Sequence, residues 1–316
     1  MTTPVMKTRN RYKWRPVDGI LLLDKPAGMT SNAALQKAKY LYGAEKAGHA
    51  GSLDPMATGL LPIFFGQGTK LCAFLLEADK CYQARVRLGE KTTTGDADGE
   101  VIARTDPSAV TEDQLRQAMA AFNGPITQIP PMYSSVRQQG VHLYQLARQG
   151  LEVERAPRAV TIHQLALDRF NGLEFEFTVH CSKGTYIRTL AEDWGAAVGQ
   201  HAHLTALRRI QTGPFVGTSM VTPEALEACR SEQAQLDPLL LPLADALPDW
   251  PKLRVNAVDA RRLRAGLECG PYAGIQPGPL AVLDELDRLL FIADADLRRR
   301  VAPRRWLGPE MPVTHG

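Results

Sequence analysis

The sequence has few cysteines, and no pattern joins them. Its five cysteines are widely spaced, and none forms a CxxC pair. An odd number without close pairs argues against a disulfide framework and against a structural zinc site. Among the histidines, His201 and His203 form an HxH pair, but no third ligand accompanies them. We therefore expect no metal and a reducing cytoplasm as the location.

Long apolar runs are also missing. The runs at residues 19–25 and 61–66 are far shorter than the ~20 apolar residues of a membrane helix. The basic start of the chain has no apolar stretch of the kind found in a secretory signal peptide. Neither a P-loop nor a glycine-rich dinucleotide fingerprint is found. The sequence thus predicts a cytoplasmic protein without a membrane partner or a nucleotide cofactor.

Excess charge is small, but its distribution is uneven. The net charge is +3. Basic residues gather near both ends of the chain, at Lys7, Arg9, Arg11, Lys13 and Arg15, and at Arg298, Arg299, Arg300, Arg304 and Arg305. Such clusters suit contacts with RNA phosphates, although on charge alone a solvated tail and an exposed helix end are the more common explanation.

The length of 316 residues favours two domains. Alternation and capping signals predict strands at 19–24, 82–88 and 175–179, and helices at about 31–42, 112–122 and 189–198. Residues 44–69, rich in glycine and proline, are expected to be an ordered loop against the core. Residues 230–252 hold several prolines and no regular period, which indicates a domain boundary at about 240–252. A small module follows, with a helix near 258–267 and strands near 280–285 and 289–294.

The densest chemical signal lies at residues 47–59, AGHAGSLDPMATG. Glycines there allow tight turns and a close approach to a ligand. Pro55 restrains Asp54, because proline fixes its own φ and biases the preceding residue towards extended geometry. A rigid carboxylate of this kind suits a nucleophile. Taken alone, however, an Asp-Pro pair is more typical of an ordinary turn.

The stretch from Gly48 to Gly59 resembles the catalytic motif of the TruB family of pseudouridine synthases, close to G-H-x-G-x-L-D-P-x-A-T-G. Further matches follow in the order of the family, at 19–31 (GILLLDKPAGMTS), 80–89 (KCYQARVRLG), 95–99 (GDADG), 182–188 (SKGTYIR) and 203–209 (HLTALRR). The matches extend from residue 19 to about residue 215, so the resemblance outweighs the interpretation of Asp54 as a turn residue.

The resemblance implies roles for six residues. Asp54 is the expected catalytic nucleophile, and Arg188 is its expected basic partner, which keeps the carboxylate ionised. Tyr82 is expected to stack on the target base, and Tyr186 and Leu207 to line the pocket. His49 is associated with base flipping and RNA contact. Plain core packing is the alternative for Tyr82 and Leu207.

The resemblance also implies the fold, the reaction and the partners. The expected fold is an α+β catalytic domain with a mixed, mainly antiparallel sheet at 1–245, with an RNA-contacting insertion at 125–158, followed by a small β-rich domain at 250–316 similar to PUA domains. The expected reaction converts uridine-55 in the T-loop of tRNA to pseudouridine on a flipped-out base, without cofactor, metal or guide RNA. A monomer is expected.

Two other functions remain open at this point. One is an RNA-binding or tRNA-folding module whose chemistry is incidental, and the presence of Asp54 argues against that as the sole role. The other is the guide-RNA-dependent branch of the family, which acts within a multiprotein particle. The long insertion and the compact architecture favour the stand-alone type. The order of bond breaking is not determined by the sequence.

Overall fold

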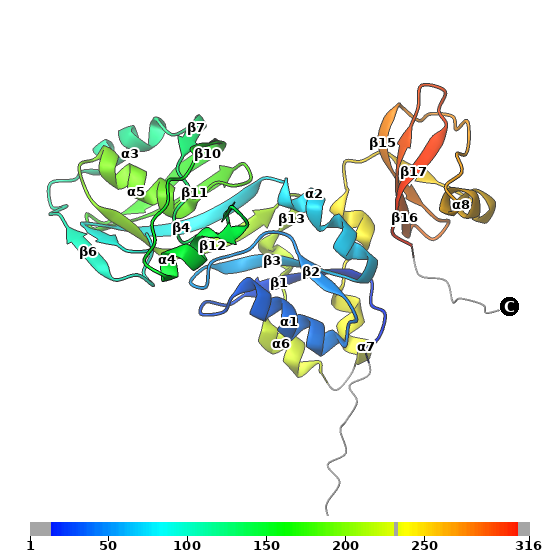
Figure 1. Ribbon diagram of the computed structural model, residues 1–316, viewed down its shortest axis with the longest axis horizontal. Coiled ribbons are helices and arrows are strands. Elements are labelled where there is room, and N and C mark those ends of the chain that lie inside the picture. The colour runs from blue at the N-terminus through cyan, green and yellow to red at the C-terminus, as the bar shows by residue number, and fades with distance from the viewer. Residues whose placement is uncertain (1–13, 231–232, 309–316) are drawn as a thin grey trace, which may run out of the picture.

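A computed structural model describes residues 14–230 and 233–308. Within these residues a nine-stranded sheet forms the centre of the larger part, with strand order β1-β3-β12-β4-β11-β10-β7, β2 on β3 and β13 on β12 (Figure 1). Its strands are β1 (Gly19–Lys25), β2 (Ala47–His49), β3 (Thr58–Phe65), β4 (Lys80–Leu88), β7 (Gly124–Gln128), β10 (Arg158–Phe170), β11 (Glu174–Cys181), β12 (Ala202–Thr212) and β13 (Phe215–Val216). Among these described strands of the sheet, only β3 and β12 pair in parallel.

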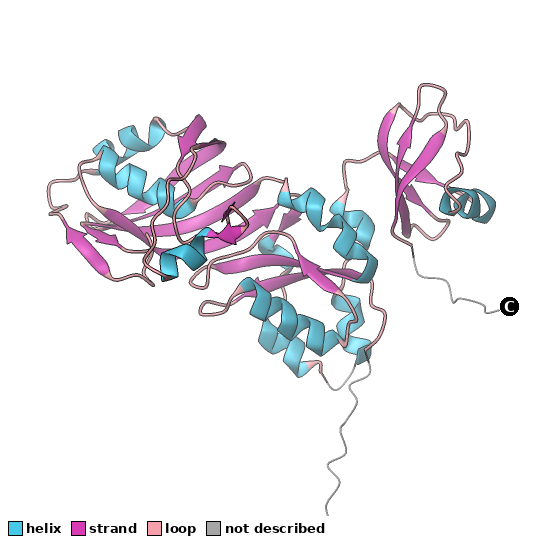
Figure 2. Ribbon diagram, in the orientation of Figure 1, coloured by secondary structure: helices cyan, strands magenta, loops and turns pink. Residues whose placement is uncertain are grey.

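Helices cover both halves of this sheet (Figure 2). The α-helices are α1 (Ser31–Tyr42), α2 (Cys72–Leu76), α3 (Glu112–Ala120), α4 (Leu143–Arg148), α5 (Ile187–Ala197), α6 (Pro223–Ala228), α7 (Gln233–Leu236) and α8 (Ala257–Arg264). Short 3-10 helices are η1 (Gly66–Leu71), η2 (Gly217–Ser219), η3 (Asp237–Leu239) and η4 (Leu243–Ala246). Two small hairpins pair β5 (Glu90–Thr92) with β6 (Val101–Arg104) and β8 (Arg137–Gln138) with β9 (Val141–His142).

Local sequence explains where the helices begin and end. The Thr30 side chain accepts a hydrogen bond from the backbone N–H of Ala33 at the start of α1, and Gly43 ends the helix in the left-handed conformation. At α3, Thr111 and Gln114 form a capping box. Both signals agree with the sequence prediction. Helix α5 begins at Ile187, two residues before the predicted start, and therefore places Arg188 in its first turn.

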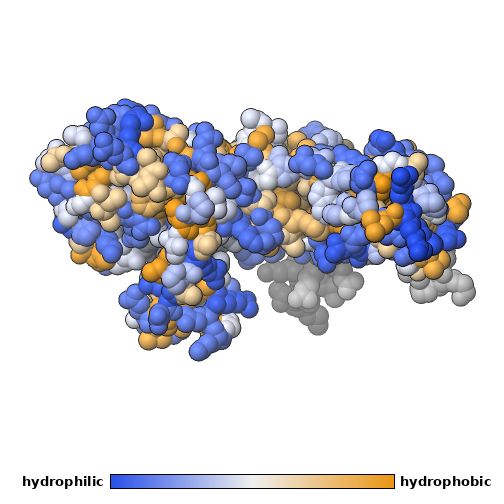
Figure 3. Space-filling model, turned by 90° about the horizontal axis from the view of Figure 1, so that it is seen from above, coloured by the Kyte–Doolittle hydropathy of each residue, from blue (hydrophilic) through white to orange (hydrophobic). Residues whose placement is uncertain are grey.

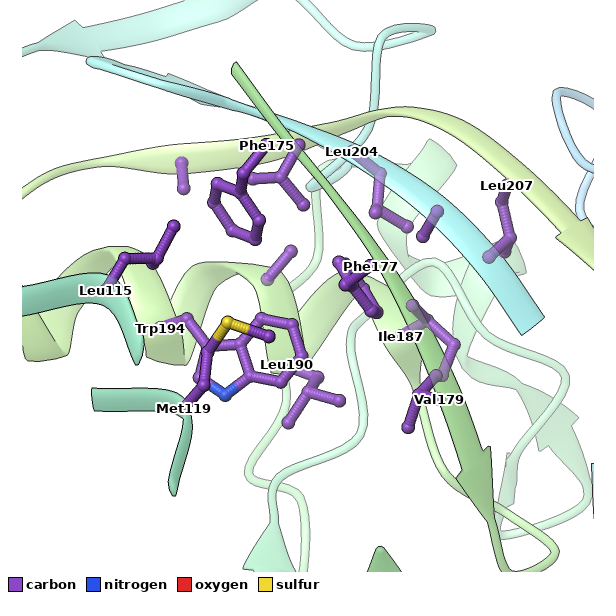
Figure 4. Close-up of a cluster of buried hydrophobic side chains, with 14 of the residues drawn as sticks. Leu115, Met119, Phe175, Phe177, Val179, Ile187, Leu190, Trp194, Leu204 and Leu207 are labelled. Carbon is purple, nitrogen blue, oxygen red and sulfur yellow. The ribbon is translucent and has the colours of Figure 1, made fainter. Parts of the chain in front are cut away.

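The core of the larger half lies between the sheet and the helices α3 and α5. Strand β11 alternates half-buried and buried residues, so that Phe175, Phe177 and Val179 face the helices. Trp194 of α5 packs edge-on against Phe177, with ring centroids 4.6 Å apart. Leu115 and Met119 of α3, together with Leu190 of α5, close the same cluster (Figure 4). This packing fixes α5, and with it the residues of the site.

Residues 44–69 are not the loop that the sequence predicted. They contain β2, β3 and the start of η1, and β3 is buried along nearly its whole length. Pro62 misled the prediction, because proline is rare inside a central strand. In β3 it pairs with Leu22, and the carbonyl oxygen of Pro62 accepts a hydrogen bond from the N–H of Ala50 at 3.3 Å. A strand buried on both faces also shows no alternation.

A second sheet forms the C-terminal part, with the order β14 (Lys252–Arg254), β15 (Gly278–Leu283), β16 (Leu289–Ala295) and β17 (Val301–Trp306). It lies at one end of an elongated molecule (Figure 1). Leu283 and Ile292 pack with Leu243 and Leu247 of the preceding segment, so the two parts share a hydrophobic cluster. The architecture confirms the predicted α+β fold with a mixed, mainly antiparallel sheet and a small C-terminal β domain.

The surface mixes polar and apolar residues. On the face seen in Figure 3, hydrophobic side chains form separate patches between hydrophilic ones. Within residues 14–230 and 233–308, no helix combines the length and the apolar character needed to cross a bilayer. Of the basic residues predicted near the N-terminus, Lys7, Arg9, Arg11 and Lys13 lie outside the described part of the chain, whereas Arg15 forms an ion pair with Asp237.

Candidate active site

Asp54 lies in the turn between β2 and β3, and hydrogen bonds to both of its neighbours hold that turn. The N–H of Leu53 donates to Ser31 Oγ at 2.7 Å, and this hydroxyl donates to the carbonyl oxygen of Leu53 at 3.1 Å. The carbonyl oxygen of Pro55 accepts a hydrogen bond from the N–H of Gly28 at 2.9 Å. The carboxylate therefore projects from a backbone that is fixed on both sides.

The fold requires the glycine at position 59 of the motif. Its φ is +96°, and a Cβ at this position would lie 2.3 Å from the carbonyl oxygen of Arg209. β3 and β12 meet here in their short parallel contact, where Gly59 pairs with Arg209. Only glycine allows both the left-handed backbone and the close approach, so Gly59 sets the point at which the Asp54 turn meets the central strands.

Arg188 uses its whole guanidinium group to join three segments. Its Nε lies 3.0 Å from Asp54 Oδ2, Nη1 donates to the carbonyl oxygen of Thr94 at 2.8 Å, and Nη2 donates to that of Tyr133 at 2.6 Å. Asp96 Oδ2 is 3.7 Å from Nε. The Arg188 side chain is only 4% exposed, whereas that of Asp54 is 38% exposed. The arginine is thus a buried anchor, and the carboxylate it holds remains accessible.

The environment of Asp54 raises the pKa of its carboxyl group. Burial is the main cause, because it disfavours the charged form, and the nearby Asp96 adds to the effect. Arg188 opposes both through its charge and its hydrogen bond, and Lys25 contributes a smaller opposing charge. The pKa of Asp54 is therefore raised on balance, and Arg188 limits that rise.

Asp54 faces a cavity of about 140 Å³ that is smaller than the pockets of drug-sized ligands. Of the six residues predicted for the site, five line it: Asp54, Tyr82, Tyr186, Arg188 and Leu207. Ser134 and Ser135 of the 125–158 insertion close another side. Tyr82 comes from β4, Tyr186 precedes α5 and Leu207 lies on β12, so the cavity assembles three separate elements around one carboxylate.

His49 is the predicted residue that does not line this cavity. It lies on β2, paired with Ile63, and is half-buried. Burial and the positive charge of Arg209 lower the pKa of its imidazole. Its Nδ1 is buried without a hydrogen-bond partner among the described residues. Because this Nδ1 is buried, it is not available to RNA, and the role of His49 in base flipping and RNA contact stays a prediction.

Two buried cations next to the site were not assigned a role from sequence. Lys25 Nζ donates to the carbonyl oxygens of Pro26 at 2.8 Å, Met29 at 2.7 Å and Pro55 at 3.3 Å, and burial lowers the pKa of Lys25 to about 8. Arg209 donates from Nε to the carbonyl oxygen of Leu60 at 2.8 Å and from Nη2 to that of Gly51 at 3.1 Å. The sequence did contain a signal for both residues: a charged residue within or next to an apolar run is expected to be buried with a partner.

Metal ligands are not grouped at the site. Within residues 14–230 and 233–308, no three side chains of His, Cys, Asp or Glu are arranged in a way that would hold a metal ion. His203, from the HxH pair, has its Nδ1 3.1 Å from the carbonyl oxygen of Glu90. The expectation of a reaction without metal or cofactor stays a prediction.

Comparison with known proteins identifies the family. Residues 39–187 match the family described as "TruB family pseudouridylate synthase (N terminal domain)", and residues 188–248 match "tRNA pseudouridylate synthase B C-terminal domain". A protein of Nitrosococcus oceani named tRNA pseudouridine synthase B is 52% identical over 301 residues, which cover 95% of this chain and 98% of that protein. One from Aeromonas salmonicida with the same name is 45% identical over 310 residues, which cover 95% and 97%.

The fold is similar to a solved structure as well. A chain in the crystal structure of a Cbf5-Nop10-Gar1 complex superimposes with a TM-score of 0.70 and 26% identity, covering 92% of this chain and 85% of that one. Sequence and fold agree with the site, in which one carboxylate and one arginine meet in a small pocket. The chain belongs to the TruB family of pseudouridylate synthases and is an isomerase.

Proposed function

We propose that the protein converts uridine-55 in the T-loop of tRNA to pseudouridine, with Asp54 as the nucleophile. The observation that carries this proposal is the Asp54–Arg188 pair, 3.0 Å apart, beside a cavity of about 140 Å³ with two tyrosines in its wall. A cavity of this size suits a single pyrimidine ring rather than a stacked duplex. The names of the relatives, tRNA pseudouridine synthase B, support tRNA as the substrate.

The chemistry needs little beyond these groups. The bond between ribose C1′ and uracil N1 breaks, the base turns, and C1′ bonds to C5. C5 then loses its proton, and N1 ends with one, so atoms and charge balance without an oxidant. The base must first leave the RNA stack, which costs a few kcal/mol, and stacking on Tyr82 offsets part of that cost, at ~1–3 kcal/mol per base. Three routes fit these groups: Asp54 attacks the ribose, attacks the base or promotes a glycal-like intermediate.

A stand-alone enzyme is the better of the two alternatives within the family. The relatives that cover this chain almost end to end bear the name of a tRNA enzyme. The guide-RNA branch remains the rival, since the similar solved structure is a Cbf5-Nop10-Gar1 complex. We infer that the protein acts as a monomer, without guide RNA, in the cytoplasm. Its five cysteines, all free, suit that reducing compartment.

The test uses a minimal T-arm stem-loop that carries tritium at C5 of uridine-55. Purified protein alone should release the tritium to water, because C5 exchanges its hydrogen for the bond to C1′. A stem-loop with cytidine at this position serves as the control and should release nothing. Release that occurs only after a guide RNA or partner proteins are added would overturn the stand-alone function.

We further infer that the insertion, residues 125–158, contacts the RNA backbone. Arg137, Arg155 and Arg158 line a second cavity, of about 170 Å³, within the insertion. Arg137 donates from Nε to His142 Nε2 at 3.2 Å. The arginines of this cavity suit phosphate oxygens, which arginine binds with two parallel N–H groups. Ser134 and Ser135 carry the same segment into the wall of the catalytic cavity.

Arg137→Gln should therefore weaken T-arm binding and make the binding constant less dependent on salt concentration. Each lost phosphate contact lowers the slope of log K against log salt concentration by about 0.7–0.9, because fewer counterions are released. Fluorescence anisotropy across a salt series measures both quantities. Arg116→Gln is the matched control, since Arg116 is paired with Glu112 on the exposed side of α3. If the slope for Arg137→Gln equals that of the wild type, Arg137 does not contact a phosphate.

We also propose that residues 250–316 form a PUA-like domain that binds RNA. The domain is tied to η1, because Lys70 Nζ donates to the carbonyl oxygen of Trp306 at 2.9 Å and Arg305 Nη1 donates to that of Lys70 at 3.0 Å. Arg261 and Arg262 lie on the exposed face of α8. Replacing both with glutamine should weaken full-length tRNA binding several-fold and leave T-arm binding unchanged in the same anisotropy assay. Equal effects on both RNAs, or none, would contradict the proposal.

A further inference from the structure

Gln128 is a buried amide that binds the backbone of a pocket residue at two points. It is the last residue of β7 and is only 2% exposed. Its Oε1 accepts a hydrogen bond from the N–H of Tyr186 at 2.9 Å, and its Nε2 donates to the carbonyl oxygen of Tyr186 at 3.2 Å. Both polar ends of the side chain are thus directed at one peptide unit on each side of Tyr186, as in a strand pair.

Tyr186 needs such a partner. It is the N-cap residue of α5, and its own side chain makes no capping hydrogen bond. The N–H of an N-cap residue has no partner within the helix, so an outside acceptor is required. Gln128 supplies it, and thereby fixes the first turn of α5, which carries Arg188 two residues further on.

Gln128 lies near the start of the insertion, 125–158, and the residues that follow it up to Ser134, the root of the insertion, contact the same turn of α5. The carbonyl oxygen of Tyr133 accepts a hydrogen bond from Arg188 Nη2 at 2.6 Å. Ser134 is 5% exposed and lies beside Tyr186 in the wall of the catalytic cavity. The start of the insertion therefore contacts the first turn of α5 at Tyr186 and at Arg188.

We propose that Gln128 is a positioning residue that couples the insertion to the catalytic pair. Through Tyr186 it holds the first turn of α5 against the root of the insertion, so that Arg188 keeps Asp54 in place while the insertion contacts RNA. Gln128 itself touches neither the base nor Asp54. The inference rests on the proposed function, because it describes how that site is aligned.

The test compares Gln128→Glu with Gln128→Met in the tritium-release assay. In Gln128→Glu, the ionised carboxylate still accepts from the N–H of Tyr186, but it has no proton to donate and places an oxygen against the carbonyl oxygen of that residue. When protonated, the same carboxyl group both accepts and donates, and restores the two bonds. Burial raises the pKa of a glutamate above its usual ~4.3. Protonation of the introduced glutamate, and with it the return of the two hydrogen bonds, should therefore occur between about pH 5 and pH 8.

We expect Gln128→Met to lower kcat by about 10- to 100-fold with little change in KM, because displacing a catalytic group by about 1 Å can cost 10²-fold. The activity of Gln128→Glu, divided by that of the wild type at each pH, should rise about tenfold as the pH falls. The same ratio for Gln128→Met should stay flat. Gln128→Met has no titratable side chain at this position, so its ratio shows how much of any change comes from the titration of Asp54 itself.

The outcomes separate this inference from the proposed function. A flat ratio for Gln128→Glu in a folded protein, or a Gln128→Met variant with the kcat of the wild type, overturns the role of Gln128 and leaves the proposed function intact. If Gln128→Glu does not fold, the separation of kcat from KM in Gln128→Met decides alone. A wild type that releases no tritium removes the proposed function, and this inference with it.

Discussion

Asp54→Asn is expected to lower turnover by at least about 10⁴-fold, which in practice means no detectable pseudouridine. Asparagine has nearly the same shape as aspartate and can still accept a hydrogen bond from Arg188 Nε, now 3.0 Å from Asp54 Oδ2. Its amide, however, is neither anionic nor nucleophilic. Loss of a nucleophile in other enzymes costs up to about 10⁶-fold. Single-turnover tritium release from the T-arm stem-loop measures the loss.

Binding of tRNA should change by less than about twofold in the same variant. Affinity for RNA rests mainly on phosphate and shape contacts, to which one carboxylate in a small cavity contributes little. Asp113→Asn is the matched control, since Asp113 lies exposed in the first turn of α3. If Asp54→Asn kept its turnover, Asp54 would not be the nucleophile. The variant also tests whether the protein assists tRNA folding, the accompanying role that the sequence left open, because such a role should survive without catalysis.

The elements that could be predicted from sequence are those with local signals. α1 is specified within its own residues by Thr30 at one end and Gly43 at the other. β12 was missed, although it is the strand that joins the two halves of the sheet. Its pairing with β4 shifts register between Leu204 and Ala206 and again between Arg209 and Gln211, which breaks the two-residue alternation. A buried Arg209 in the middle removes the remaining apolar pattern.

The residues of the candidate site also fall into two groups, those that the sequence predicted and those that it did not. Asp54 and Arg188 were predicted because each lies in a motif that resembles the family, and the structure places them 3.0 Å apart. Gln128 and Arg209 were not assigned roles, because each acts through hydrogen bonds to the backbone of a segment far away in sequence. Every residue has backbone N–H or C=O groups, so the sequence of a segment does not show which of them bind a distant side chain. Such partners become visible only when the fold brings the segments together.

Arg188→Met should be the second most damaging change, with kcat/KM lowered by about 10²- to 10³-fold or more. A single preorganised electrostatic group contributes an effect of this size in other enzymes. Methionine fills much of the same volume but leaves Asp54 and Asp96 in a buried site without the cation between them. It also leaves the carbonyl oxygens of Thr94 and Tyr133 without their donor.

The pH profile gives the variant a specific signature. In the wild type, burial raises the pKa of Asp54 and Arg188 opposes that rise. Without the guanidinium, the pKa of Asp54 rises further, so a larger fraction of the carboxyl group is protonated and inactive at a given pH. The acid limb of kcat/KM, which reports the free enzyme, should therefore move to higher pH, and the residual activity should increase as the pH is raised through this limb.

Arg188→Lys separates charge from geometry. A lysine retains the positive charge beside Asp54, and the acid limb should therefore stay closer to that of the wild type. Its ammonium group cannot bind Asp54, Thr94 and Tyr133 in the planar arrangement of a guanidinium, so kcat should still fall, by about tenfold or more. Arg85→Met, which breaks an exposed ion pair with Glu176 on the open face of the sheet, is the control and should leave both kcat and the acid limb unchanged. An acid limb that stays in place in Arg188→Met would mean that Arg188 acts only as a structural anchor, and the electrostatic account of the pair would have to be abandoned.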